Sequence, residues 1–204
     1  MSKIYLISKP EIPDFDLYIQ NLELIFATQH VDTYQLRLKN CKDSDWIKAG
    51  EITKSLCQEF NVNFIINDRV DLIKTIKPNG IHLGQSDGDI LPIRKEFGDK
   101  FIIGRSCYDS QEFAQKACND QASYIAFGTF FPSKSKEQIY KPKKEIIRWA
   151  KANLNTKTCA IGGLYPHNLN HFKAFEPDYY CFISAIWDSN NKAKTLSEIK
   201  ALIS

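Results

Sequence analysis

The chain has 204 residues, of which 43% are hydrophobic and 12% aromatic, so it carries enough apolar side chains for one sizeable buried core. No run of 18 apolar residues occurs, which excludes a membrane-spanning helix, and the four-residue apolar stretch near the start is too short for a secretion signal, so we expect a cytoplasmic protein. The net charge of +3 is mild and dispersed, which argues against nucleic acid or membrane as a partner and is compatible with a small anionic substrate.

Short apolar runs rich in β-forming residues recur along the chain and predict eight strands. Several are almost continuously apolar, which is typical of parallel strands that are covered on both faces. In chain order, the predicted strands are Ile4–Ile7, Thr33–Leu38, Asn63–Ile66, Gly80–Leu83, Phe101–Ile103, Tyr124–Phe127, Thr158–Ile161 and Tyr179–Ile183.

Helical periodicity marks segments between these strands and the end of the chain. Ser44-Asp45 and Asp109-Ser110 are the expected N-caps of the helices that follow them. The shortest crossover, from Asp68 to Lys77, has room for barely two turns of helix. The apolar positions expected to share a helix face are Tyr18-Leu22-Ile25, Ala49-Ile52-Leu56-Phe60, Phe113-Ala114-Ala117 and Leu196-Ile199-Ile203.

Strands that alternate with helices, without a linker or a low-complexity segment, predict parallel βαβ units in one domain covering residues 1–204. A closed barrel and an open doubly wound sheet both fit this pattern. No Gly-x-Gly-x-x-Gly follows the first strand, where an open dinucleotide-binding fold would carry it, so we favour a single (β/α)8 TIM barrel. In such a barrel the functional residues lie at the C-terminal ends of the strands and in the loops behind them.

Polar residues follow the second, third and fourth predicted strands. Gln35, Arg37 and Lys39 alternate with leucines, so we expect all three on one face. Inside a barrel the two cations would suit a polyanion, whereas the alternative is a strand whose cationic tips reach solvent. Asp68 and Asp87 end neighbouring strands and could hold Mg²⁺ together with phosphate oxygens and water, although ordinary turn chemistry also explains Asp68.

The loops after the last three strands suit phosphate groups. After the sixth strand, Ser133 and Ser135 alternate with lysines that include Lys136; a phosphate-binding loop and an ordinary solvated loop are both open readings of this pattern. After the seventh strand, Gly162-Gly163 gives a phosphate room to approach backbone N–H groups, and Ser184 adds a hydroxyl after the eighth.

Taken in this order, these segments resemble those of the thiamine-phosphate synthase family. The resemblance covers nearly the whole chain, from Tyr5 to Ile186. It is carried by Gln35-x-Arg37-x-Lys39, Asn67-Asp68, His82-Leu-Gly-Gln-x-Asp87, Phe131-Pro-Ser133-Lys-Ser135-Lys136, Ile161-Gly-Gly163 and Ile183-Ser184-Ala-Ile.

This resemblance implies a transferase that condenses 4-amino-2-methyl-5-hydroxymethylpyrimidine diphosphate with a thiazole phosphate, with or without a carboxylate, and releases pyrophosphate through a pyrimidine cation. It implies Mg²⁺ as the cofactor, held by Asp68 and Asp87. The catalytic residues implied are Arg37, Lys39, Ser106 and Lys136; the implied contacts to the pyrimidine diphosphate are Gln35, Arg37, Lys39, Asn67, Ser106 and Lys136, and those to the thiazole phosphate are Ser133, Ser135, Gly163, Ile183 and Ser184.

Two other functions remain as alternatives. Tyr108 stands where many relatives carry a histidine, and in the related thiazole tautomerases a histidine at that position moves the proton. A phenol with a pKa of about 10 is a poor proton shuttle at neutral pH, so we favour the synthase. A non-catalytic barrel that binds phosphorylated ligands would show affinity without turnover. The sequence leaves the oligomeric state open, a homo-oligomer included.

Overall fold

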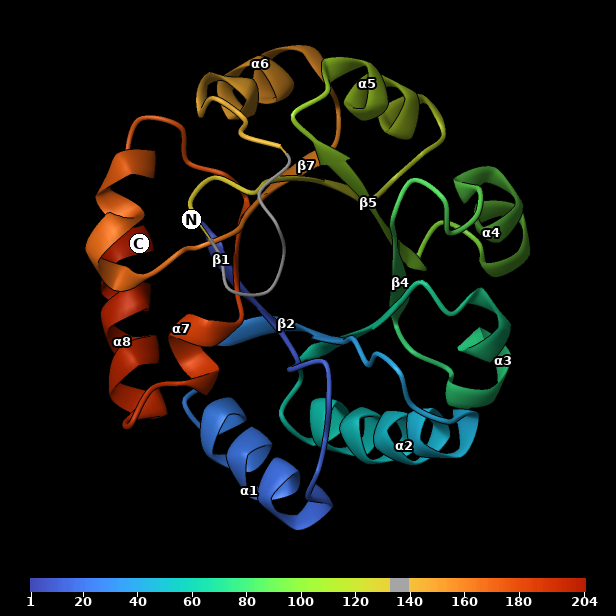
Figure 1. The fold of residues 1–204 in the computed structure, drawn as a ribbon. Helices are drawn as coiled ribbons and strands as arrows, with labels where there is room; N and C mark the ends of the chain where they lie inside the picture. The colour runs from blue at the N-terminus through green and yellow to red at the C-terminus, as the bar shows by residue number, and fades with distance from the viewer. Residues whose placement is uncertain (133–139) are drawn as a thin grey trace.

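Eight parallel strands close into a barrel in the computed structural model, which describes residues 1–132 and 140–204 (Figure 1). Each strand pairs with the next along the chain, and the last pairs with the first. The predicted TIM barrel is therefore confirmed. The strands are β1 Lys3–Ile7, β2 Val31–Leu36, β3 Asn63–Asn67, β4 Gly80–Leu83, β5 Ile102–Tyr108, β6 Tyr124–Phe127, β7 Lys157–Ile161 and β8 Tyr179–Phe182.

Helices surround the barrel on its outer side (Figure 1). The α-helices are α1 Phe15–Phe26, α2 Asp43–Glu59, α3 Ile73–Ile76, α4 Ile90–Phe97, α5 Gln111–Asn119, α6 Glu145–Asn153, α7 Ser184–Trp187 and α8 Lys192–Ile203. Three-ten helices lie between some of these elements: η1 Val70–Leu72 precedes α3, and η2 Pro166–Phe172 connects β7 to β8. No helix within these described ranges is long and apolar enough to cross a membrane.

Side-chain alternation along the strands builds two apolar layers. One layer fills the space between strands and helices and includes Leu36 and Phe127, which are both fully buried. The other fills the barrel interior, where the rings of Tyr5, Tyr124 and Tyr179 meet in edge or tilted contacts with centroids 5.6–6.1 Å apart. This aromatic layer occupies the interior, as expected for a packed barrel, and polar groups gather at the C-terminal ends of the strands.

Most local predictions are confirmed, and the exceptions concern where elements begin or end. The fifth strand runs from Ile102 to Tyr108, so it extends five residues beyond its predicted end at Ile103. Ser110 caps α5 as expected, with its Oγ accepting a hydrogen bond from the backbone N–H of Phe113. In contrast, α2 begins at Asp43, so Ser44-Asp45 lies inside its first turn and Lys42 takes the N-cap position without a side-chain cap. The second strand ends at Leu36 rather than Leu38. Beyond Leu36 the backbone N–H of Arg37 donates to the side-chain Oγ of Ser8 instead of to a strand backbone.

Candidate active site

A cavity of about 770 Å³ lies at the C-terminal ends of the strands. Every strand, or the loop directly after it, contributes to its lining. Most residues that the sequence singled out are among the lining residues: Gln35, Arg37, Asn67, Asp68, Asp87, Ser106, Gly163, Ile183 and Ser184. The predicted residues Ser133, Ser135 and Lys136 lie outside the described residues.

Two carboxylates converge on one glycine at the edge of this cavity. Asp68 follows β3 in the left-handed region, with φ of 62°, and its Oδ1 accepts a hydrogen bond of 3.2 Å from the backbone N–H of Gly84. Its Oδ2 accepts a hydrogen bond from the side chain of Asn67. A Cβ on Gly84 would lie 2.3 Å from Oδ2 of Asp87, so glycine is what allows the Asp87 carboxylate to lie against this backbone.

The electrostatics of this acid pair fit a divalent cation. Burial raises the pKa of the Asp68 carboxyl, and the charge of Asp87 raises it further. Within residues 1–132 and 140–204, no group of three or more His, Cys, Asp or Glu side chains is arranged to hold a metal. Two carboxylates with positions left for substrate oxygens and water match the way Mg²⁺ is usually bound, so the donor set fits this ion.

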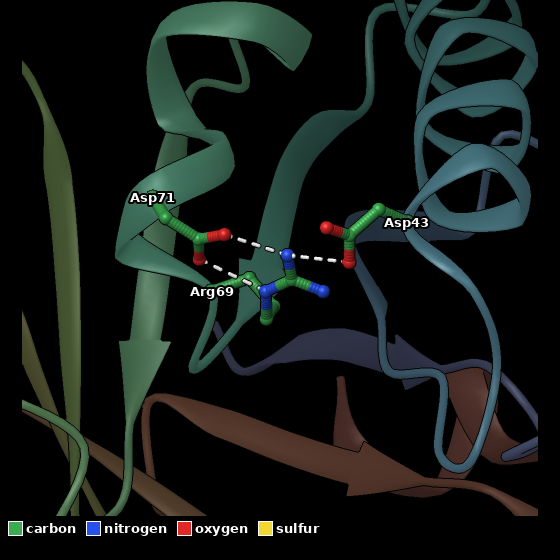
Figure 2. Close-up of polar contacts among 3 residues, drawn as sticks. All are labelled: Asp43, Arg69 and Asp71. Atoms are coloured by element: carbon green, nitrogen blue, oxygen red, sulfur yellow. Dashed lines mark hydrogen bonds and ion pairs between the residues drawn. The ribbon is translucent and has the colours of Figure 1, made fainter.

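The cation nearest to Asp68 in sequence does not pair with it. Arg69 donates to both carboxylate oxygens of Asp71, at 2.9 and 2.6 Å, and pairs with Asp43 at 2.8 Å (Figure 2). It therefore ties the start of η1 to the start of α2 on the outer side of the barrel. Arg69 is therefore engaged by Asp43 and Asp71 rather than by Asp68.

Arg37 supplies positive charge inside the cavity. Its side chain is half-buried and makes no ion pair with a carboxylate of the described chain. Burial lowers the pKa of its guanidinium, and the charge of Asp68 acts in the opposite direction. Its backbone is fixed, because the Arg37 N–H donates to Oγ of Ser8 at 2.8 Å. Arg37 thus places a positive charge in the cavity lining from a backbone position that Ser8 fixes.

Lys39 does not share this position, although the sequence predicted three polar side chains on one face. The strand ends at Leu36, so the alternation does not continue to Lys39, which is exposed and is not among the cavity-lining residues. Its backbone N–H instead donates to the carbonyl of Pro10. The expected location of Lys39 inside the barrel is wrong, and its part in ligand binding stays a prediction.

A chain of hydrogen bonds crosses the barrel interior beneath the cavity. Nε2 of Gln35 donates to the hydroxyl of Tyr5 at 2.8 Å, and this hydroxyl lies 2.7 Å from that of Tyr124. The Tyr124 hydroxyl lies 2.9 Å from Nδ1 of His82, whose Nε2 lies 2.9 Å from Oγ of Ser106. These bonds orient the side chains of Gln35 and Ser106, which are the first and last residues of this series of hydrogen bonds.

Sequence reasoning missed the two tyrosines of this hydrogen-bond chain. Tyr5 and Tyr124 lie in predicted strands, where an aromatic residue indicates only that the side chain packs. A buried tyrosine hydroxyl needs a partner, which is the signal that could have found them. His82 belongs to a motif that carries the family resemblance, but its bonds to Tyr124 and Ser106 join separate strands and become visible only in the fold.

Tyr108 lies at the rim of the cavity in an aromatic stack. Its ring is parallel to that of Tyr140, with centroids 4.4 Å apart and an interplanar angle of 16°. Burial raises the pKa of its phenol, and the neighbouring Tyr140 raises it further. Tyr108 therefore keeps its proton at neutral pH, and its ring packs against Tyr140.

A glycine pair after β7 shapes the opposite wall of the cavity. Gly162 and Gly163 have φ of +102° and +63°, and a Cβ on Gly162 would lie 2.2 Å from Cγ2 of Thr129. The backbone of the loop after β6 docks there, since the N–H of Phe131 donates to the carbonyl of Gly162. Ile183 and Ser184 line the same wall, directly after β8. Both glycines are therefore needed where the loop after β6 packs against this segment.

Comparison with known proteins adds to this geometry. The family model described as thiamine monophosphate synthase matches residues 4–186. The chain belongs to this family. A thiamine-phosphate synthase from Pelagibacter ubique is 34% identical over 199 residues, which cover 98% of this chain and 95% of that protein. A thiamine-phosphate synthase from Clostridium perfringens is 31% identical over 202 residues, covering 99% and 96%.

Among solved structures, the thiamine phosphate pyrophosphorylase from Pyrococcus furiosus superposes on this family member with a TM-score of 0.84 and 24% identity. The superposition covers 98% of this chain and 95% of that one. This likeness shows a shared fold, and the matches in sequence are what establish the family.

Proposed function

We propose that this chain is a thiamine-phosphate synthase, a transferase that joins a pyrimidine diphosphate to a thiazole phosphate and releases pyrophosphate. The observation that supports this most is a single cavity in which the acid pair Asp68 and Asp87 lies at the same end as the cation Arg37. A substrate with a diphosphate has the charge that this combination would bind. Membership of the thiamine monophosphate synthase family supports the same reaction.

The diphosphate binds between the cation and the acid pair in this proposal. Arg37 and Ser106 donate hydrogen bonds to its oxygens, and the amide of Asn67 lies beside them. Asp68 and Asp87 would hold Mg²⁺, which when bound would neutralise the charge of the leaving pyrophosphate. The described residues thus hold the leaving group at one end of the cavity while the pyrimidine ring extends over the barrel interior.

The chemistry needs little covalent help from the protein. The bond between the exocyclic CH2 and the diphosphate oxygen breaks, its electron pair leaves with pyrophosphate, and the electron-rich aminopyrimidine stabilises the cation that remains. The thiazole nitrogen then donates its lone pair to this CH2 and forms the new C–N bond. The protein contributes alignment of the two reactants and charge stabilisation, which are the largest sources of rate enhancement in such sites.

We assign the remaining predicted residues by their place in the cavity. Gln35 lies under the pyrimidine position, where its orientation is fixed by the hydrogen bond to Tyr5. The backbone of Gly163, together with Ile183 and Ser184, is our proposed site for the thiazole phosphate. Roles for Lys39, Ser133, Ser135 and Lys136 stay predictions from the family resemblance. Both substrates are phosphorylated and cross membranes poorly, so we place the reaction in the cytoplasm.

One assay separates this proposal from its rivals. The purified protein is mixed with the two phosphorylated precursors and Mg²⁺, and thiamine phosphate is measured by chromatography. We expect product to accumulate over many turnovers. Isomerisation of an unisomerised thiazole carboxylate phosphate without C–N bond formation would indicate a tautomerase, and binding of both precursors without product would indicate a non-catalytic barrel.

A further inference from the structure

A buried arginine lies directly behind the loop that carries Asp87. Arg105 is on β5, paired with Leu83 of β4, and only 7% of its surface is exposed. The residues on either side of it face the barrel interior, so Arg105 points to the outer layer. There Nη1 donates to the carbonyl of Gly84 at 2.5 Å, and Nη2 donates to the carbonyl of Gly88 at 2.7 Å.

These two carbonyls are the two ends of the loop that holds Asp87. The guanidinium is planar and rigid, so two bonds from one group fix the separation of the loop ends. Gly88 has φ of +116°, a conformation that side chains other than glycine rarely adopt. The backbone N–H of Asp87 also approaches the carbonyl of Gly84, at 3.4 Å. Arg105 thereby ties together the two backbone ends of the loop that carries Asp87.

Gly84, which accepts the hydrogen bond from Arg105, also contacts Asp68. Gly84 accepts from Arg105 through its carbonyl and donates through its N–H to Oδ1 of Asp68, so one residue links the arginine to both carboxylates. Two carboxylates at close range repel each other, and without a cation this repulsion acts to push the Asp87 loop away. A fixed loop resists that movement.

We propose that Arg105 is a positioning residue that holds Asp87 beside Asp68 and so determines how tightly the acid pair binds a divalent cation. This inference rests on the proposed function only for the role of that cation in the reaction. Groups that orient metal-binding side chains commonly change metal affinity by about 10- to 100-fold when they are removed. Lysine keeps the charge but cannot bridge both carbonyls, so Arg105→Lys tests the bridge rather than the charge.

Arg94 provides a matched control. It is similarly buried, at 8% exposure, and donates to the carbonyls of Gly98, Phe101 and Gln121. These acceptors lie before β5 and β6, at the N-terminal ends of the strands and away from the cavity. Arg94→Lys should therefore lower the melting temperature without changing metal affinity.

The experiment measures binding of Mn²⁺ alone, by the relaxation enhancement of water protons, in the wild-type protein and in Arg105→Lys, Arg105→Met and Arg94→Lys. We expect the Kd for Mn²⁺ to rise about 10-fold or more in both Arg105 variants and to stay unchanged in Arg94→Lys. In turnover, Arg105→Lys should need more Mg²⁺ for half-maximal rate and recover most of its kcat at saturating Mg²⁺.

A folded Arg105→Lys protein with wild-type Mn²⁺ affinity would overturn the inference, and so would failure of both Arg105 variants to fold, because Arg105 would then be a residue of the core. Asp87→Asn separates this outcome from failure of the metal site itself. If Asp87→Asn and the wild-type protein bind Mn²⁺ equally, the acid pair is not the cation site, whatever the Arg105 variants do.

Discussion

Replacing Arg37 with Met removes a cation that lines the cavity and has no ion-pair partner in the described chain. Methionine keeps an unbranched side chain of similar reach, so the cavity wall is preserved while the charge and the hydrogen-bond donors are lost. We expect weaker binding of pyrophosphate and slower turnover, because the guanidinium meets the leaving group in the proposed reaction.

The expected loss of pyrophosphate affinity can be worked out from the hydrogen bond that the guanidinium would make to the diphosphate. A hydrogen bond to a charged group contributes about 1.5 to 3 kcal/mol, so losing one should raise the Kd for pyrophosphate about 10- to 150-fold. The free protein should change in stability by no more than about 1 kcal/mol, because the cation is partly desolvated and has no carboxylate in contact with it. Arg37→Lys restores the charge without the bidentate grip and should give intermediate affinity.

Isothermal titration with pyrophosphate and Mg²⁺ measures the affinity, and thermal melts measure the stability of the same samples. Arg148→Met serves as the control, since Arg148 is an exposed cation on α6 that lies over the ring of Phe175. The reasoning is refuted if Arg37→Met unfolds most of the protein while the folded fraction binds pyrophosphate and turns over as the wild type does. Arg37 would then be a structural residue.

Three further predictions concern the acid pair, the aromatic stack and the interior hydrogen bonds. Asp68→Asn and Asp87→Asn should each lower turnover by about 100-fold or more with the fold intact, and near-native rates at low Mg²⁺ would show that these are not the metal ligands. Because the pKa of Tyr108 is raised, its phenol keeps its proton to a higher pH than a free phenol does, so no isomerisation of a thiazole carboxylate phosphate should appear by NMR at pH 7 to 9; conversion that Tyr108→Phe abolishes would contradict this. Tyr124→Phe removes the hydroxyl that bonds to Tyr5 and His82 and should cost about 1 to 3 kcal/mol in urea unfolding, and a loss below about 0.5 kcal/mol would mean that the hydrogen-bond chain is not stabilising.

The barrel could be predicted from sequence because its signal is local and repeated. Each strand is a short apolar run, and each is followed by a helix or turn, so errors at single ends do not change the topology. The acid pair was predictable for the same reason, since Asp68 and Asp87 directly follow neighbouring strands of a parallel sheet. Parallel strands bring such residues to one edge without any further information.

Features that depend on contacts between distant segments could not be predicted. The hydrogen bond between Tyr5 and Tyr124 joins residues 119 positions apart, and neither residue indicates the other in the sequence. Arg69 is the cation adjacent to Asp68 in the sequence, yet in the structure it pairs with Asp43 at the start of α2. In the sequence, Lys39 continues the alternation of polar residues and leucines. In the structure, the backbone beyond Leu36 bonds to Ser8 and Pro10, which follow β1, so the strand alternation does not extend to Lys39.

The most direct test of the proposed reaction counts both products in one vessel. The protein is supplied with the pyrimidine diphosphate and the thiazole phosphate, and thiamine phosphate and pyrophosphate are quantified together over time, with and without EDTA. We predict that the two products form in equal amounts at every time point and that chelation of the metal stops both. Pyrophosphate released without thiamine phosphate, or neither product from a protein that binds both substrates, would contradict the proposal.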